Sequence, residues 1–215
     1  MRLYQSIGPN PRVVTMFIAE KGLTVPRVRV DLVGGENRRE PYLSKNPQGG
    51  IPTLELDDGS AIAESTVICE YLEEIHPNPP LIGATPEARA RTRAALRQID
   101  QSIVVPASNG FRSSEGLRLF RERTLCVPEA AAGNKAYAAD GFRRIDAMLG
   151  DRAFVTGAGF TLADIVLFCF AEFAGSVGQG VAPELTNIAR WQATLAARPA
   201  AIASANPKIG IEEPA

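Results

Sequence analysis

The chain has 215 residues, of which 45% are hydrophobic and 22% charged, so it can bury a substantial core as one domain or as two small ones. Its 23 basic and 24 acidic residues give a net charge of -1, which excludes the general attraction to phosphate backbones or anionic membranes that a strongly basic chain has. No apolar run approaches the ~20 residues of a membrane span, and the first residues lack a signal-peptide core. We therefore expect a soluble, cytoplasmic protein with neither nucleic acid nor a membrane as partner.

The first half of the sequence predicts a small mixed sheet with helices. Residues 2–7 and 25–33 alternate apolar and polar side chains as strands do, and residues 9–22 between them read as a helix ended by Gly22. Two further strands, joined by a tight turn at 57–59, precede a helix from Ser65 to about Ile75. The order βαβ then ββα predicts a thioredoxin-like arrangement in about 80 residues.

A proline-rich segment then changes the character of the chain. We place a linker at residues 77–86, between a thioredoxin-like domain at 1–76 and an all-helical domain at 87–215. Helical patterns in the second domain cover residues 87–108, 115–150, 161–178 and 184–205. The fold class expected is therefore an α/β N-terminal domain followed by an all-α domain.

The cysteines and the single histidine give no sign of redox or metal chemistry. Cys69, Cys126 and Cys169 are far apart and form no Cys-x-x-Cys pair, so neither a disulfide framework nor a metal site is predicted. The apolar neighbours of Cys69 and Cys169 indicate buried packing. His76 ends a helical pattern before Pro77, and we interpret it as a surface cation rather than a catalytic base.

Ile51-Pro52 stands directly before the third predicted strand. A proline at the first position of a strand costs no ladder hydrogen bond, so a purely structural role would explain it. Its place after an Asn-Pro-x-Gly turn and before a hairpin favours a cis peptide bond instead. In that geometry the backbone of Ile51 would face solvent and could pair with an extended peptide, as an added strand does.

Glu64-Ser65 marks the start of the next helix. Ser65 is predicted to be its N-cap. The unpaired N–H groups of a helix start attract a carboxylate, and Glu64 could take an ammonium group. Together the two residues suit the head of an amino acid, which carries both charges.

The segment before the first helix holds candidates for activating a thiol. Asn10 is predicted to cap that helix through its side-chain oxygen, which would leave its amide N–H groups free to donate to a thiolate. Lowering a thiol pKa from ~8.5 by about two units requires ~2.7 kcal/mol, which a charge-assisted hydrogen bond and a helix terminus can supply. Ser6, at the end of the first strand, is a second possible donor.

These motifs resemble those of the cytosolic glutathione transferases over nearly the whole chain. The likeness covers residues 3–22 (LYQSIGPNPRVVTMFIAEKG), 46–77 (NPQGGIPTLELDDGSAIAESTVICEYLEEIHP), 154–168 (FVTGAGFTLADIVLF) and 187–200 (NIARWQATLAARPA). The resemblance implies the glutathione transferase fold, a homodimer, a detoxifying role, and glutathione as co-substrate with no metal.

The resemblance also assigns roles residue by residue. In this family the proline matching Pro52 is cis, and the residue matching Ile51 pairs with the cysteinyl backbone of glutathione. Those matching Glu64 and Ser65 hold the γ-glutamyl group. Thr161 and Asp164 of the second half fall at the start of a core helix, where they form the pattern of a capping box, so we assign these two to folding.

The sequence departs from the family in two places. Residues 5–15 contain no Tyr or Cys, one of which often activates the thiol, so Asn10 is the first candidate and Ser6 the second. Gly50 stands where relatives often carry a Lys, Arg or Gln near the glycyl end of glutathione. The candidates to replace that group are Lys45, Gln48 and Arg12.

A small hydrophobic electrophile is the expected second substrate, in a pocket between the two halves. The residues predicted to line that pocket are Ile7, Pro9, Asn109, Phe111 and Arg112. An equally good interpretation places Phe111 in the core and Arg112 on the surface. Several functions remain open: a conjugating transferase, a glutathione-dependent lyase or ether-cleaving enzyme, a disulfide reductase, and a non-catalytic binding or regulatory protein of the same fold.

Overall fold

The computed structural model describes residues 1–205, which form two compact units. The first unit contains residues 1–79 and 198–205, and the second contains residues 80–197. The final ten residues of the predicted helical domain, 206–215, lie outside the described part.

The first unit is built on a four-stranded mixed sheet of order β2-β1-β3-β4. The strands are β1 (Arg2–Gln5), β2 (Arg27–Arg29), β3 (Thr53–Glu55) and β4 (Ala61–Ala63). β1 pairs parallel with β2 after the crossover helix α1 (Pro9–Glu20), whereas β1 with β3 and β3 with β4 are antiparallel. The thioredoxin-like order predicted from the sequence is confirmed.

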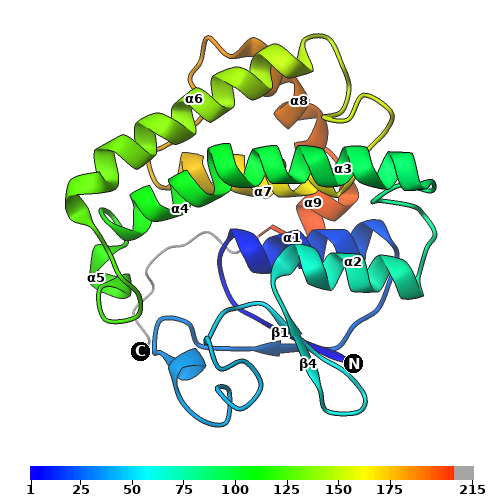
Figure 1. The fold of residues 1–215 in the computed structure, drawn as a ribbon. Helices are drawn as coiled ribbons and strands as arrows, with labels where there is room; N and C mark the ends of the chain where they lie inside the picture. The colour runs from blue at the N-terminus through cyan, green and yellow to red at the C-terminus, as the bar shows by residue number, and fades with distance from the viewer. Residues whose placement is uncertain (206–215) are drawn as a thin grey trace. The chain divides into compact units, whose positions relative to one another are not determined.

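Helices cover one face of this sheet. α1 and α2 (Ser65–Ile75) lie together on that face, as Figure 1 shows, and the short helix α9 (Pro199–Ala203) packs against α1. Leu3 of β1 and Leu54 of β3 are register partners and are both fully buried. Alternate strand residues share a face, so these leucines define the apolar side of the sheet.

The other face of the sheet carries a mixed polar and aromatic layer. Tyr4 and Thr53 are register partners one position along from the leucines, and Tyr42 packs edge-on against Tyr4 with ring centroids 6.0 Å apart. The connection from β2 to β3 supplies Tyr42 and contains the short 3₁₀ helix η1 (Glu36–Arg38). Tyr42 of this layer donates a hydrogen bond to the carbonyl of Gly50, in the loop that precedes β3.

Gly22 ends α1 in the manner that the sequence predicts. Its φ of 64° is in the left-handed region, which a glycine adopts without a steric cost. The N–H of Gly22 donates to Ala19 and that of Leu23 donates to Ile18, both at 3.0 Å. These two hydrogen bonds form a Schellman motif, which satisfies carbonyl groups that the end of a helix leaves unpaired.

The second unit is helical. Its elements are α3 (Pro86–Ile99), the π-helix η2 (Asp100–Val104), α4 (Val105–Arg112), α5 (Leu117–Phe120), the 3₁₀ helix η3 (Pro128–Ala130), α6 (Ala131–Leu149), α7 (Leu162–Ser176) and α8 (Thr186–Ala196). α7 is the most buried of them and forms the centre of this unit. Among residues 1–205, none of the helices is long and apolar enough to cross a bilayer.

Two helical patterns read from the sequence differ from the structure in their detail. The first continues as far as Arg112, through a π-helical segment placed just before Pro106. Proline has no N–H for the carbonyl four residues earlier, and a π-helical turn accommodates that loss. The predicted run at 115–150 is interrupted between α5 and α6, because Val127 before Pro128 is held out of the helical region.

Asp164 fixes the start of α7. Thr161 and Asp164 form the predicted capping box, and the Asp164 carboxylate is fully buried. It accepts hydrogen bonds from the N–H and hydroxyl of Thr161, from the N–H of Val155 at 2.9 Å and from Nε1 of Trp191 at 3.1 Å. Burial raises the pKa of Asp164, although these donors oppose the increase. The position is therefore part of the folding core of the second unit.

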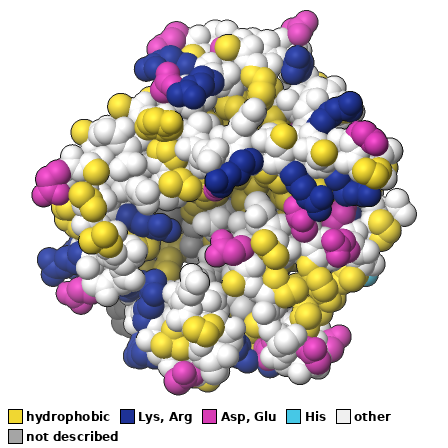
Figure 2. Space-filling view, in the orientation of Figure 1, with side chains coloured by type: hydrophobic (Ala, Val, Ile, Leu, Met, Phe, Trp, Pro, Cys, Tyr) yellow, Lys and Arg dark blue, Asp and Glu magenta, His cyan; other side chains and the backbone are white. Residues whose placement is uncertain are grey.

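The environments predicted for Cys69, Cys169 and His76 are confirmed. Cys69 and Cys169 are buried and form no disulfide, and His76 is exposed at the C-terminal end of α2. Cys126 is partly exposed. Basic and acidic side chains are interspersed over the face shown in Figure 2, in keeping with a net charge of -1.

Candidate functional site

The topology of the sheet brings the predicted binding residues to one edge. β1 ends just before Ser6, and β3, antiparallel to β1, begins just after Ile51-Pro52. β4 is antiparallel to β3 with Thr53 opposite Ala63, so Glu64 and Ser65 follow at the same end. Segments up to 59 residues apart in sequence, Ser6 and Ser65, therefore meet at this edge of the sheet.

Ile51 presents an unpaired backbone at that edge. The Ile51-Pro52 peptide bond is cis, as predicted. Among residues 1–205, neither the N–H nor the C=O of Ile51 has a hydrogen-bond partner, and the residue is only partly buried. Its side chain packs against the cluster of Tyr4, Val30 and Tyr42. The side chain is thus anchored in the fold while both backbone groups remain able to pair with an extended peptide.

Glu64 has a backbone conformation that is rare for a residue with a Cβ. Its φ is 70°, and among the described residues it is the non-glycine residue with positive φ. Such a conformation costs on the order of 1–3 kcal/mol and tends to occur at functional sites. The side chain is exposed, and its carboxylate has no hydrogen-bond or ion-pair partner within residues 1–205. Glu64 is therefore an available acceptor for an ammonium group.

The predicted N-caps of α1 and α2 are both wrong. Gly8 caps α1 and Glu64 caps α2, and neither uses a side chain to do so. The N–H of Arg12 already bonds the Gly8 carbonyl, and that of Ile68 bonds the Glu64 carbonyl at 2.9 Å. Asn10 and Ser65 therefore lie within the first turns, since the fixed φ of Pro9 lets α1 begin one residue before Asn10.

Asn10 and Ser65 instead bond to each other. The Ser65 hydroxyl donates to Oδ1 of Asn10 at 2.9 Å, which links the first turns of α2 and α1. Within the described residues, Nδ2 of Asn10 has no acceptor, so the amide donor that the sequence analysis required is available, although its oxygen has a different partner. Ser6, Ile7 and Pro9 lie in the partly buried segment between β1 and Asn10.

Three residues were proposed to supply the polar side chain that relatives carry at the position of Gly50. The structure places each of them in a different environment. Nζ of Lys45 is 2.9 Å from Oε1 of Glu55, at the other end of β3 from Pro52. Arg12 is buried, and its Nη2 donates to the Ala201 carbonyl at 3.4 Å. Gln48 remains exposed beside the two glycines.

One cation near this loop was missed in the sequence analysis. Nη1 of Arg38 donates to the carbonyl of Gln48 at 3.0 Å. Arg38 is ten residues away in a turn-rich segment without periodicity, and the sequence carries no signal that joins them. The structure therefore adds an arginine to the surroundings of the glycine pair.

Glu55 binds the ammonium group of Lys45 and so keeps it away from the Gly49-Gly50 pair. Its carboxylate, mostly buried, accepts hydrogen bonds from Arg2, from Lys45 and from the Tyr4 hydroxyl. These donors, Arg2 first, lower the pKa of Glu55 to about 2. The four residues form a hydrogen-bonded cluster of one carboxylate, two cations and a phenol on the polar face of the sheet.

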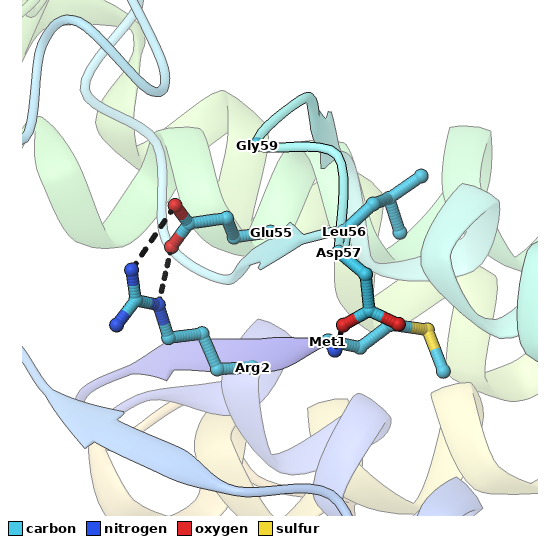
Figure 3. Close-up of a pocket in the computed structure, with 6 residues that line it drawn as sticks. All are labelled: Met1, Arg2, Glu55, Leu56, Asp57 and Gly59. Atoms are coloured by element: carbon cyan, nitrogen blue, oxygen red, sulfur yellow. Dashed lines mark hydrogen bonds and ion pairs between the residues drawn. The ribbon is translucent and has the colours of Figure 1, made fainter.

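A shallow cavity adjoins this cluster, at the opposite end of the hairpin from Pro52 and Glu64. It has a volume of about 320 Å³, and the residues that line it are Met1, Arg2, Glu55, Leu56, Asp57 and Gly59. Figure 3 shows that its charged groups pair with one another: Arg2 with Glu55, and the N-terminal ammonium with Asp57. Because each of these charged groups already has a partner of opposite charge, the cavity is a poor candidate for a ligand site. Within residues 1–205, no group of His, Cys, Asp or Glu is arranged to hold a metal ion.

The candidates from the helical unit belong to one aromatic region. Phe111 is partly buried, with its ring edge-on to Phe173 at 5.2 Å and to Phe120 at 5.9 Å. The guanidinium carbon of Arg112 lies 5.5 Å from the centre of the Phe120 ring, and Asn109 is exposed. These contacts place Phe111 in a satellite cluster of the unit and give Arg112 a cation–π partner.

Comparison with known proteins identifies the architecture. Residues 3–80 match the family model "Glutathione S-transferase, N-terminal domain", and residues 128–200 match "Glutathione S-transferase, C-terminal domain". The chain is 31% identical over 199 residues to "Glutathione S-transferase 2" of Saccharomyces cerevisiae, with 89% of this chain and 83% of that protein covered. It is 30% identical over 204 residues to "Maleylacetoacetate isomerase" of Pseudomonas aeruginosa, covering 94% and 93%.

Solved structures agree. A glutathione S-transferase domain-containing protein of Marinobacter aquaeolei matches with a TM-score of 0.87 and 33% identity, over 93% of this chain and 99% of that one. A thioredoxin-like unit followed by a helical unit is thus the shared architecture, the glutathione transferase fold. The chain belongs to the glutathione S-transferase family.

Proposed function

We propose that this chain is a glutathione transferase, which binds glutathione where β1 ends, β3 begins and β4 ends, and which promotes attack by its thiolate. The observation that carries the proposal is the meeting of Ile51-Pro52 with Glu64-Ser65 at one edge of the sheet. An extended peptide with an amino-acid head is the ligand that this combination fits. Membership of the family supports the choice of glutathione among such peptides.

Each part of the ligand has a proposed partner. The unpaired backbone of Ile51 would pair with the cysteinyl residue, and the unpartnered carboxylate of Glu64 would take the γ-glutamyl ammonium. The backbone N–H of Ser65, at the start of α2, would hold the α-carboxylate, because the Ser65 hydroxyl already donates its proton to Asn10. For the glycyl carboxylate, Gln48 and Arg38 are favoured over Lys45, since the ammonium of Lys45 is already bound to Glu55.

Asn10 is the proposed thiol-activating residue, with Ser6 as the second candidate. A free Nδ2 donor near the N-terminal end of α1 would stabilise a thiolate, whereas an amide cannot accept the thiol proton. The proton therefore goes to solvent. The thiolate then forms a C–S bond while the leaving group departs with its electron pair, or attacks a disulfide and releases a thiolate.

The electrophile and the assembly are also proposals. The second substrate that we propose is a small hydrophobic electrophile, and Ile7, Pro9, Asn109, Phe111 and Arg112 stay sequence-based predictions for the residues that contact it. Family membership supports a homodimer, a cytoplasmic location and a role in detoxification. The similarity to a maleylacetoacetate isomerase adds isomerisation to the reactions worth assaying, beside conjugation, ether cleavage and disulfide reduction.

Calorimetric titration of the full chain with glutathione tests this function. We expect saturable binding, and for Glu64→Ala an affinity at least about tenfold lower, because one charge-assisted contact is lost. Glu74→Ala removes an exposed carboxylate ten residues further along the same helix and serves as the matched control. Absence of binding at millimolar glutathione would leave the alternative, a non-catalytic protein of this fold, which the missing Tyr and the Gly50 departure favour.

A further inference from the structure

The carbonyl group of Gly50, directly before Ile51, is held by three side chains. It accepts hydrogen bonds from Oη of Tyr42 at 2.6 Å, from Nδ2 of Asn46 at 3.0 Å and from Oγ1 of Thr53 at 3.3 Å. All three donor residues are at most 6% exposed, although Gly50 itself is exposed. A carbonyl oxygen has two lone pairs, and this one lies within hydrogen-bond distance of three buried side chains. The Gly50 oxygen is therefore the centre of the network.

The donors form a closed hydrogen-bond network. Nδ2 of Asn46 is also 3.1 Å from Oγ1 of Thr53, and the Tyr42 and Thr53 hydroxyls are 2.9 Å apart. Asn46 donates to Gly50 and Thr53, and Tyr42 donates to Gly50, while the single hydroxyl proton of Thr53 goes either to Gly50 or to Tyr42. Burial raises the pKa of Tyr42, so its hydroxyl keeps the proton that it donates.

The preceding residue is held in the same way. The carbonyl of Gly49 accepts a hydrogen bond from Nδ2 of Asn37 at 2.7 Å, and Asn37 is buried. Two successive carbonyl groups of the Gly49-Gly50 pair are therefore drawn into the polar layer on the face of the sheet away from α1 and α2. The same layer contains Tyr4 and Thr53.

Planarity of the peptide unit passes this constraint to Ile51. The C=O of Gly50 and the N–H of Ile51 belong to one peptide unit, and the peptide bond between them is trans. In a trans unit the two groups point in opposite directions. Because the oxygen is fixed inward by Tyr42, Asn46 and Thr53, the N–H of Ile51 is fixed outward, and it has no partner within residues 1–205.

We propose that Tyr42, Asn46 and Thr53 are positioning residues, which fix the Gly50 carbonyl so that the Ile51 N–H meets the cysteinyl carbonyl of a bound thiol peptide. The inference rests on the proposed function, glutathione binding at this edge. It extends that function to three buried side chains on the far face of the sheet, none of which touches the ligand. Their contribution is preorganisation, which lowers the ordering cost of binding.

The chain offers a matched control for this role. The Tyr4 hydroxyl donates to Glu55 at 2.8 Å, and the Tyr4 ring packs edge-on against Tyr42 in the same cluster. Tyr4→Phe and Tyr42→Phe therefore remove the same chemical group from the same layer. Only Tyr42→Phe removes a donor from the Gly50 carbonyl.

The test measures the affinity of both variants and of the wild type for two ligands, glutathione and γ-glutamyl methylamide. The second ligand keeps the amino-acid head but has no cysteinyl carbonyl. For Tyr42→Phe we expect about a tenfold loss of affinity for glutathione and a change below about twofold for γ-glutamyl methylamide. Tyr4→Phe should change both affinities by less than about twofold. Thr53→Val, a change of similar shape, provides a second variant with the same expectation as Tyr42→Phe.

Equal losses of glutathione affinity in Tyr42→Phe and Tyr4→Phe would overturn the inference, as would equal losses for both ligands in Tyr42→Phe. Either result would indicate general loosening of the layer. In both cases the wild type still binds glutathione, so the proposed function stands. A wild-type protein that binds no glutathione overturns the proposed function itself, and the inference with it.

Discussion

The Ser65 hydroxyl donates a hydrogen bond to the side-chain oxygen of Asn10, 2.9 Å away, and so joins the first turns of α2 and α1. Because the oxygen of the Asn10 amide faces Ser65, its nitrogen is the group directed elsewhere. The pair thus links the residue proposed to hold the ligand's head to the residue proposed to stabilise its thiolate.

Asn10→Ala should raise the pKa of the bound glutathione thiol. One charge-assisted hydrogen bond stabilises an anion by about 1.5–3 kcal/mol, so the increase expected is about one to two units. The measurement is a pH titration of thiolate absorbance with glutathione saturated by protein. Ser6→Ala is the control, and an increase in Ser6→Ala alone would assign the activation to Ser6.

Glu64→Gly should separate folding from binding. Glycine adopts a φ of 70° without the steric cost that a Cβ imposes, so the variant should unfold at an equal or higher urea concentration than the wild type. Its affinity for glutathione should nevertheless fall, because the carboxylate is gone. A variant that is both more stable and fully able to bind would remove Glu64 from the site.

The two adjacent glycines should respond differently to substitution. At Gly50 a Cβ would meet only Nδ2 of Asn46, at 3.4 Å, so Gly50→Gln should fold normally. At Gly49 φ is +64° and a Cβ would lie 2.6 Å from the carbonyl oxygen of Asn37, so Gly49→Ala should lower the unfolding free energy by about 2 kcal/mol. Urea unfolding of both variants checks this. Similar destabilisation of both would contradict the backbone geometry of the loop.

Glu55 should make stability depend on pH in the acid range. Its pKa falls from 4.5 in the unfolded chain to about 2 in the folded one, so the folded state favours the ionised form. This stabilisation is fully present above about pH 4.5 and is lost as the pH falls through about 2. In Glu55→Gln the decline of unfolding free energy across this window should be shallower than in the wild type. Identical slopes in acid unfolding curves would rule out the effect.

Asp164→Ala should destabilise the helical unit. The buried carboxylate serves donors from Val155, Thr161 and Trp191, and their loss should cost about 3–5 kcal/mol in unfolding free energy. Asp140→Ala, which removes a surface partner of Arg144, should cost below about 1 kcal/mol. Loss of activity in Asp164→Ala at unchanged stability would instead give Asp164 a functional role.

Local patterns predicted most of the fold because they act over short distances. Alternation and helical period located all four strands and the helices that cover them, and the Gly22 terminus followed from the freedom of glycine at positive φ. The two cap predictions were wrong because the helices begin after Gly8 and Glu64, and the Ser65 hydroxyl instead donates to Asn10, 55 residues away, which no local rule describes.

The site was predicted unevenly for the same reason. Ile51, Pro52, Glu64 and Ser65 carry family motifs and lie together, as strand register requires. Lys45 was a reasonable candidate by position, but Glu55, ten residues later, binds its ammonium. The roles of Arg38 and Tyr42 depend on how the segment after β2 folds back on the Gly49-Gly50 pair, which becomes visible only in three dimensions.

The most direct test of the account is to map the backbone amide resonances of the full chain during titration with glutathione. We expect saturable shifts at Ile51 and Ser65, whose backbone N–H groups are the two proposed to meet the ligand. The turn at residues 57–60, at the far end of the hairpin, should not respond. Saturable shifts confined to that turn, or none at millimolar glutathione, would contradict it.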